Sequence, residues 1–317
     1  MKKITAIIMT AAMLFLMSVT SFAAFTDMPE GADREVLQKA VDNGLIEGFE
    51  DNTVRPDTPI TRAQMAAIMS RAMKTEEMAD LSSFVDVEKD DWYYEAMAKA
   101  VYMGSFIGDD KNQLNPNNSI SRQEALIVLS RIFDVPAADT SKLTAYSDGS
   151  IVSSWAKKEV SSIAAAGYLG DTTAIRPLDA MTRLEFAQIM DRIVSTYIDE
   201  AGEYTELPAG NVLVRAENVS FKNINTDNVI FIGDGVKSEV SFTDCALERL
   251  VVRGKQAVIN SGTYAYIRAI GKGTEVKLMK MPMELIEKFP NGKYGQFYAK
   301  PGYGTIIPPG MQEGNVE

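Results

Sequence analysis

Residues 60–64 read Ile-Thr-Arg-Ala-Gln, residues 120–124 read Ile-Ser-Arg-Gln-Glu, and residues 181–185 read Met-Thr-Arg-Leu-Glu. The arginines of these steps are 60 and 61 residues apart, and each lies six residues after a proline. They are Arg62, Arg122 and Arg183. A pattern that recurs at a fixed interval of this size indicates a repeated structural unit. The sequence therefore predicts three copies of one unit and three similar surfaces that each carry an arginine.

Each unit reads as two short helices joined by a loop. The first helix has apolar residues at helical spacing and ends before a glycine, which is Gly44, Gly104 or Gly167. The loop contains a second glycine and the proline, and the second helix starts at the Thr/Ser-Arg step. The third, fourth, sixth and seventh residues after each arginine are apolar, which predicts a long buried face. Because one helix pair cannot bury this face alone, we expect three pairs to pack together with the second helices at the centre.

The arginine occupies an unusual place in this pattern. Its neighbours Thr61, Ser121 and Thr182 are each followed three residues later by Gln or Glu, which is the capping-box pattern of a helix start. At the first helical position the helix dipole disfavours a cation, whereas Arg71, Arg131 and Arg192 lie near the helix ends, where the dipole favours one. The later arginines therefore need no functional explanation, but the earlier ones call for an anion.

Two kinds of anion are open at this stage. One is an aspartate near the start of each unit, at Asp27, Asp86 or Asp148, which would form an internal ion pair. The other is an external anion that is bound jointly by the guanidinium and the helix N-terminus. Two units also place a tryptophan, Trp92 or Trp155, twelve residues before the helix-ending glycine. These tryptophans either pack in the core or stack on the apolar face of a sugar ring.

These units resemble S-layer homology repeats. The resemblance rests on the aromatic-x-Asp starts, the tryptophan, the Gly…Gly…Pro loop and the three arginine steps, and it covers residues 25–74, 84–134 and 146–197. It implies an all-α spindle with pseudo-threefold symmetry around a central three-helix bundle. It also implies non-covalent binding of pyruvylated secondary cell-wall polysaccharide, linked to peptidoglycan, in grooves between the units. The residues that it assigns to these grooves are Arg62, Arg122, Arg183, Asp27, Asp86, Asp148, Trp92, Trp155, Gly48, Gly108 and Gly170.

The first unit departs from this pattern twice. Ala32 stands in the tryptophan column, and Gln64 replaces the glutamate of the capping box. We therefore expect fewer than three working grooves.

The amino-acid composition excludes several classes of catalytic and metal site. The chain has no histidine, which excludes Ser-His-Asp, Cys-His and histidine-ligated zinc sites, and we expect neither a metal nor a cofactor. From Phe25 to Glu200 there are 30 acidic and 17 basic residues, so this part is a poor candidate for binding nucleic acid or anionic lipid. The single cysteine, Cys245, cannot form an internal disulfide.

Residues 1–23 have the basic start, short apolar run and small-residue exit of a secretory signal peptide. The mature chain contains no second long apolar run, so we expect no membrane span and a secreted protein of the cell wall or S-layer.

The pattern changes to strand-like after Glu200. Residues 219–223 (VSFKN) recur as residues 240–244 (VSFTD), and each copy is followed by an aliphatic strand that ends in glycine. Repeats of this length suggest the stacked coils of a small parallel β-helix of about three coils, with an antiparallel sandwich as the alternative. The whole chain is thus an α+β multidomain protein, with the three repeats in residues 24–200 and a β-rich domain with an irregular tail in residues 201–317.

The leading functional expectation is a wall-anchored surface protein with a structural or display role, without catalytic residues and with possible surface-lattice neighbours. The alternative is a wall-tethered enzyme whose β-helix acts on a polysaccharide. It requires two carboxylates that converge at roughly 5–10 Å in a groove. The candidates are Asp227, Asp234 and Asp244.

Overall fold

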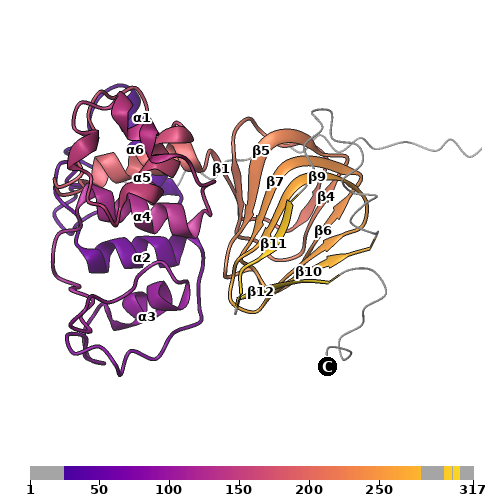
Figure 1. The fold of residues 1–317 in the computed structure, drawn as a ribbon, viewed down its shortest axis with the longest axis horizontal. Coiled ribbons are helices and arrows are strands. Elements are labelled where there is room, and N and C mark those ends of the chain that lie inside the picture. The colour runs from indigo at the N-terminus through magenta and orange to yellow at the C-terminus, as the bar shows by residue number, and fades with distance from the viewer. Residues whose placement is uncertain (1–24, 280–295, 302, 308–317) are drawn as a thin grey trace, which may run out of the picture.

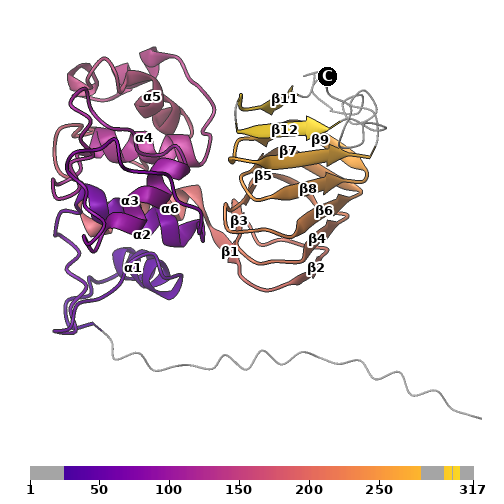
Figure 2. The same ribbon diagram turned by 90° about the horizontal axis from the view of Figure 1, so that it is seen from below.

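The computed structural model describes residues 25–279, 296–301 and 303–307, which form a helical part and a β part lying side by side (Figures 1 and 2). The expected signal peptide, residues 1–23, lies outside the described residues, as does most of the tail after Met281. Among the helices that are described, none combines the length and the apolarity that a membrane crossing requires.

Each unit of the helical part contributes two α-helices. They are α1 (Ala32–Asp42) and α2 (Arg62–Ala72), α3 (Tyr94–Tyr102) and α4 (Arg122–Ile132), and α5 (Lys157–Ala165) and α6 (Arg183–Ile193). The third unit adds two 3-10 helices, η1 (Thr140–Ala145) and η2 (Gly149–Ile151). The second helices begin at the predicted arginines with complete capping boxes. Two residues after each of the first helices lie Gly44, Gly104 and Gly167, whose φ angles of 69°, 71° and 77° favour glycine over any other residue.

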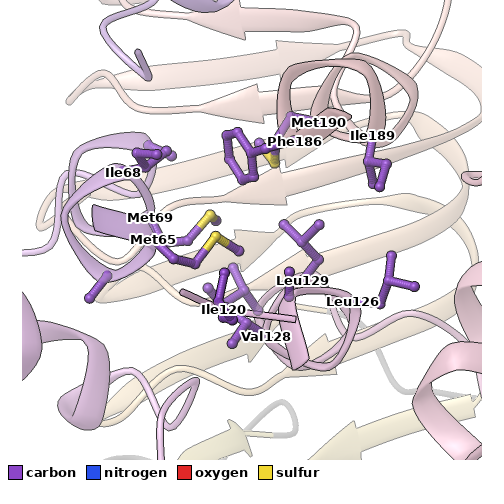
Figure 3. Packing of buried hydrophobic residues seen from close by; sticks show 14 of the residues in the cluster. Met65, Ile68, Met69, Ile120, Leu126, Val128, Leu129, Phe186, Ile189 and Met190 are labelled. Atoms are coloured by element: carbon purple, nitrogen blue, oxygen red, sulfur yellow. The ribbon is translucent and has the colours of Figure 1, made fainter. Parts of the chain in front are cut away.

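The second helices pack together at the centre, as predicted. Figure 3 shows Met65 and Met69 of α2, Leu129 of α4 and Phe186 of α6 pointing toward one another, and all are buried. The segments before these helices form a closed ring of backbone hydrogen bonds. Ile60 N–H donates to Met181 O (2.9 Å), Ile120 N–H donates to Ile60 O (3.0 Å), and Met181 N–H donates to Ile120 O (2.9 Å). The three units are therefore related by a pseudo-threefold arrangement.

The β part is a two-sheet parallel solenoid. One sheet contains the odd-numbered strands β1 (Thr196–Ile198), β3 (Val212–Val214), β5 (Asn225–Ile232), β7 (Cys245–Val252), β9 (Gly262–Ala269) and β11 (Gln296–Ala299). The other contains β2 (Gly202–Tyr204), β4 (Val219–Lys222), β6 (Glu239–Thr243), β8 (Gln256–Ile259), β10 (Thr274–Leu278) and β12 (Gly304–Ile307). All strand pairs within the described residues are parallel, which confirms the β-helix and excludes the antiparallel sandwich.

The solenoid core follows the sequence repeat. The two VSF copies pair in register, so that Phe221 of β4 stacks on Phe242 of β6 with ring centroids 5.0 Å apart. Cys245 is buried, and burial raises the pKa of its thiol. The coils begin at Thr196 and continue to β12, so the solenoid extends at both ends beyond the three copies that the sequence pattern indicates.

The odd-numbered sheet faces the ends of the helices (Figures 1 and 2). Leu213, Phe231 and Val251 of this sheet belong to the same buried cluster as the helices. Arg215 Nη1 donates to Asn43 O (2.9 Å) at the end of α1, and Arg253 Nη2 donates to Met103 O (2.8 Å) at the end of α3. Carbonyl groups at a helix C-terminus lack helical partners, so these arginines stabilise the helix ends that the solenoid covers.

Candidate functional site

The three repeated arginines connect neighbouring units in a cycle. Arg62 Nε donates to Leu114 O (2.7 Å) and Arg122 Nε donates to Ile175 O (2.7 Å). Arg183 Nε closes the cycle by donating to Val54 O (2.6 Å) of the first unit. Each acceptor lies two residues before the loop proline of the next unit. Part of each guanidinium therefore serves the fold by holding a neighbouring loop in place.

Two of the arginines also have a carboxylate partner from the next unit. Arg62 Nη1 lies 2.9 Å from Glu124 Oε1, and Arg122 Nη1 lies 3.1 Å from Glu185 Oε2. These partners are the capping-box glutamates, so each of them serves a helix start and an arginine at once. This pairing was not predicted from the sequence, where the early aspartates were the internal partners considered for the arginines. The signal in the sequence is the spacing of 62 or 63 residues between an arginine and the capping-box glutamate one unit later.

Arg183 differs from the other two because the corresponding partner is Gln64, which carries no charge. Among the described residues no carboxylate forms an ion pair with Arg183, although its Nη2 also donates to Glu47 O. The residue is 6% exposed, and burial together with the nearby charge of Arg71 lowers the pKa of its guanidinium. Arg183 is thus a nearly buried cation whose charge is not neutralised by an internal ion pair.

The helix N-termini are not open to an external anion, which corrects one expectation. Arg62 N–H donates to Asn118 O (2.9 Å), Arg122 N–H donates to Asp179 O (2.8 Å), and Arg183 N–H donates to Thr58 O (3.1 Å). The next amide of each helix is also bonded to a loop carbonyl of the neighbouring unit. Because the first amides are satisfied within the protein, only the side chains of this region can receive an anion.

The early aspartates do not pair with the arginines. Asp27 accepts hydrogen bonds from the N–H groups of Val54 and Arg55, both at 2.7 Å. Asp86 and Asp148 accept the equivalent pairs of N–H groups in their own units, at 2.7–2.9 Å. Each aspartate therefore fixes the loop whose carbonyl the arginine binds, and the expected Asp–Arg ion pair is replaced by this indirect link.

The tryptophans lie on the surface. Trp92 is 67% exposed and Trp155 is 59% exposed, so core packing does not explain them. Each precedes the first helix of its unit by two residues, and that helix packs on the second helix of the preceding unit. Each indole therefore stands beside a hollow that belongs to other units.

We name the first hollow the Arg62 groove. Its volume is about 510 Å³, and its lining combines Arg62 of the first unit with Trp155 of the third. The second unit supplies Asp109, Glu124 and Arg131. Two arginines thus face two carboxylates, and the charges of the groove balance.

We name the second hollow the Arg183 groove. Its volume is about 180 Å³, and it combines Arg183 of the third unit with Trp92 of the second. The first unit supplies Glu47, Gln64 and Arg71. Two arginines face one carboxylate, so this groove has an excess positive charge in a chain whose net charge is −11. Arg71 and Arg131, for which the sequence suggested no role, thus both line grooves.

The loop glycines shape these hollows through an aromatic contact. A Cβ at Gly48 would lie 2.0 Å from the ring of Phe25, and a Cβ at Gly108 would lie 2.5 Å from the ring of Phe84. A side chain at either position would displace the aromatic residue that starts the unit. At Gly170 the guanidinium of Arg192 takes this place, with its atoms 2.6–2.8 Å from the Cβ position.

The third equivalent position, at Arg122, lacks the tryptophan. Helix α1 packs on α6 as α3 packs on α2, and Gln188 Nε2 of α6 donates to Asp33 Oδ1 (2.7 Å). Exposed Ala32 therefore stands where the other positions have tryptophan. The two departures of the first unit, Ala32 and Gln64, consequently affect different grooves.

The carboxylates considered for catalysis do not converge. Asp234 forms an ion pair with Arg253 (2.6 Å), and both side chains are at most 4% exposed. Asp227 lies near the start of β5, whereas Asp234 lies in the turn after its end, so the five strand residues from Asp227 to Ile232 separate them by roughly 16 Å at ~3.3 Å per residue. The register of β5 and β7 places Asp244 two residues before the Asn225–Ala246 pair and Asp227 two residues after it, about 13 Å apart along the strands. These separations exceed those of a glycosidase pair.

Comparison with known proteins agrees with the repeat pattern. A family model described as the S-layer homology domain matches residues 24–66 and 83–126. The chain is 28% identical over 233 residues to the Surface-layer 125 kDa protein of Lysinibacillus sphaericus, covering 71% of this chain and 18% of the relative. It is 28% identical over 171 residues to Exoglucanase XynX of Acetivibrio thermocellus, covering 52% of this chain and 16% of the relative. The chain therefore spans less than a fifth of the length of these relatives.

Proposed function

The chain contains S-layer homology domains, and from this premise we propose that its helical part anchors it non-covalently to the cell wall by binding an acidic secondary polysaccharide. The domains and the surface-layer relative place the chain at the cell surface, in the cell wall or the S-layer. Its role is structural or one of surface display. The binding sites are the Arg62 and Arg183 grooves, and the ligand group is a sugar that carries a pyruvate ketal.

The observation that carries this proposal is the unpaired charge of Arg183. A buried cation without an ion-pair partner is unfavourable, and a ligand carboxylate that enters the groove supplies the missing ion pair. Guanidinium–carboxylate hydrogen bonds are among the strongest available to a protein, so the ketal carboxylate is a suitable partner. Arg71 also lines this groove, where it pairs with Glu47 at 3.6 Å, so the positive charge of Arg183 is the one left without a carboxylate.

The tryptophan supplies the second half of the recognition. Trp92 is exposed and lines the same groove as Arg183. An indole face suits the C–H groups of a sugar ring, whereas the arginine suits the anionic substituent. Together they select a sugar that is acidic at one edge and apolar on one face, which a pyruvylated residue of the wall polymer provides.

The two grooves differ in what a ligand must overcome. In the Arg62 groove Glu124 already pairs with the guanidinium, so an incoming carboxylate must displace Glu124 or bind beside it. In the Arg183 groove Gln64 offers no such competition. We therefore assign the tighter binding to the Arg183 groove and weaker binding to the Arg62 groove. The position at Arg122, with Glu185 and without a tryptophan, contributes least.

The test is co-sedimentation of the protein with purified Gram-positive sacculi, before and after acid extraction of the secondary polysaccharide. We expect binding to be lost on extraction. Sacculi whose polysaccharide lacks the ketal form the second arm, and we expect binding to fall strongly there too. Binding that survives extraction would overturn the glycan anchor, and binding that is lost on extraction but indifferent to the ketal would overturn only the choice of ligand group.

A further inference from the structure

A polar cleft runs along the seam between the helical part and the solenoid, and the anchoring role leaves it unassigned. Its volume is about 780 Å³. The helical wall comes from the end of α4, the loop after it and α5, and the opposite wall comes from β5, β7 and β9 of the odd-numbered sheet. Figures 1 and 2 show this sheet facing the helices.

The cleft adjoins the Arg62 groove through one residue. Arg131, near the end of α4, lines both hollows and is half-buried. Within the described ranges it donates no hydrogen bond and joins no ion pair, so its charge is available to a ligand. Because the two hollows share Arg131, a chain bound in the Arg62 groove lies next to the seam cleft.

The solenoid wall holds two arginines in fixed positions. Asp134 Oδ2 accepts from Arg249 Nη2 (2.7 Å) and from Arg268 Nε (2.6 Å), and Arg268 Nη2 reaches Asp134 Oδ1 at 3.1 Å. One carboxylate thus serves two guanidinium groups, which leaves this cluster with a positive charge. Because each arginine is anchored, an anion that binds here orders few additional side-chain bonds, and this lowers the entropic cost of binding.

The remaining lining gives the cleft the character of a sugar site. Lys158 adds an exposed cation on the helical wall, while Tyr168 and Tyr266 add half-buried aromatic rings from the two opposite walls. Across the whole lining four cations oppose three carboxylates, in a chain with a net charge of −11. Aromatic rings between anchored cations match a polymer that alternates apolar sugar faces with anionic groups.

We propose that the seam cleft is an extension subsite for the same acidic wall polysaccharide, in which the solenoid and the helical part hold sugars that follow the one in the Arg62 groove. The inference rests on the proposed anchoring function. It gives the solenoid a direct part in wall binding, and it predicts that affinity increases with the length of the polysaccharide.

The experiment measures the affinity of the full chain, by calorimetry, for acid-released secondary polysaccharide and for its terminal disaccharide. Wild-type protein should bind the long polymer more tightly than the disaccharide when both affinities are expressed per terminal sugar. Lys158→Glu should weaken polymer binding by about fivefold, as expected for reversal of one surface charge, and leave disaccharide binding unchanged. Lys222→Glu, the same change at an exposed lysine of β4 in the other sheet, is the matched control.

A second variant, Tyr266→Phe, keeps the ring and removes one hydroxyl at the edge of the cleft, and it should also reduce only polymer binding. The outcomes separate the two proposals. If neither ligand binds the wild-type protein, the anchoring function fails. If the disaccharide binds but the polymer gains nothing, or if Lys158→Glu and Lys222→Glu behave alike, the extension subsite is wrong while the anchor stands.

Discussion

The Arg183 groove and the Arg62 groove use the same positions of one repeat, yet the first is positively charged and the second is balanced. Gln64 and Glu124 occupy the same place in the capping box and differ by one amide in place of one carboxylate. Both side chains complete the helix start equally well. The substitution of glutamate by glutamine therefore leaves the helix start unchanged. It alters only the charge that faces the arginine of the neighbouring unit. A repeat can thus keep its structure while its copies diverge in binding.

The largest expected effect comes from removing the unpaired arginine. Arg183→Ala should reduce wall binding by about 50-fold, because a charge-assisted hydrogen bond is worth roughly 1.5–3 kcal/mol. Arg122→Ala is the matched control, since it breaks the same kind of loop contact, to Ile175 O, at the position without tryptophan. Both variants should lose about 1–3 kcal/mol of stability. Binding is measured well below both melting temperatures, and equal losses of binding would erase the distinction between the two positions.

The next effect tests the amide directly. Gln64→Glu preserves the capping box but gives Arg183 an internal partner, so wall binding should weaken by about tenfold and the melting temperature should hold or rise. The reverse change, Glu124→Gln, should strengthen binding at the Arg62 groove. Measuring both variants with the same polysaccharide decides the matter, because the comparison requires opposite signs. Shifts in the same direction would show that the capping-box residue acts through the fold.

A smaller effect is expected from the aromatic walls. Trp92→Ala should weaken binding by about five- to tenfold, in line with roughly 1–1.5 kcal/mol for a lost aromatic contact. Trp155→Ala should cost less, because the Arg62 groove contributes less to the total. Since both side chains are largely exposed, thermal unfolding should be unchanged. A drop in melting temperature would instead show that the tryptophans stabilise the fold.

The smallest expected effect is on the pH dependence of stability below pH 4.5. Burial disfavours the charged form of Glu185, but hydrogen bonds from Thr182 and Arg176 and the charge of Arg122 outweigh it and hold the pKa of this carboxyl below its usual 4.5. A lowered pKa stabilises the fold above pH 4.5, and this contribution disappears as the pH falls through the lower folded-state value. Urea unfolding of Glu185→Gln should therefore depend less on pH in that window than unfolding of the wild type. The position of Gln64 contributes no such dependence because an amide does not titrate.

Local signals predicted the units well. The capping boxes at Thr61, Ser121 and Thr182 placed the second helices, and the repeated VSF step placed β4 and β6 in register. Both are short-range patterns whose physical meaning does not depend on the rest of the chain.

Contacts between units could not be predicted in the same way. The Arg62–Glu124 pair spans 62 residues, and the bonds from Arg253 to the helix ends span more than a hundred. Such pairs follow from how the units close around the axis and against the sheet, which no local pattern encodes. For the same reason the sequence suggested that the N-terminal amides of the second helices could bind an external anion. In the structure these amides donate to loop carbonyls of the neighbouring units.

The ring of backbone bonds through Ile60, Ile120 and Met181 has a consequence for how this protein can change in length. Each unit donates a backbone hydrogen bond to one neighbour and accepts one from the other, so that three units close the ring. A fourth copy would therefore find no free edge, and the loss of one copy would leave two edges without hydrogen-bond partners. The solenoid has no such closure, since each coil contacts only its neighbours. Duplication within the gene can therefore lengthen the β part coil by coil, while the helical part is fixed at three.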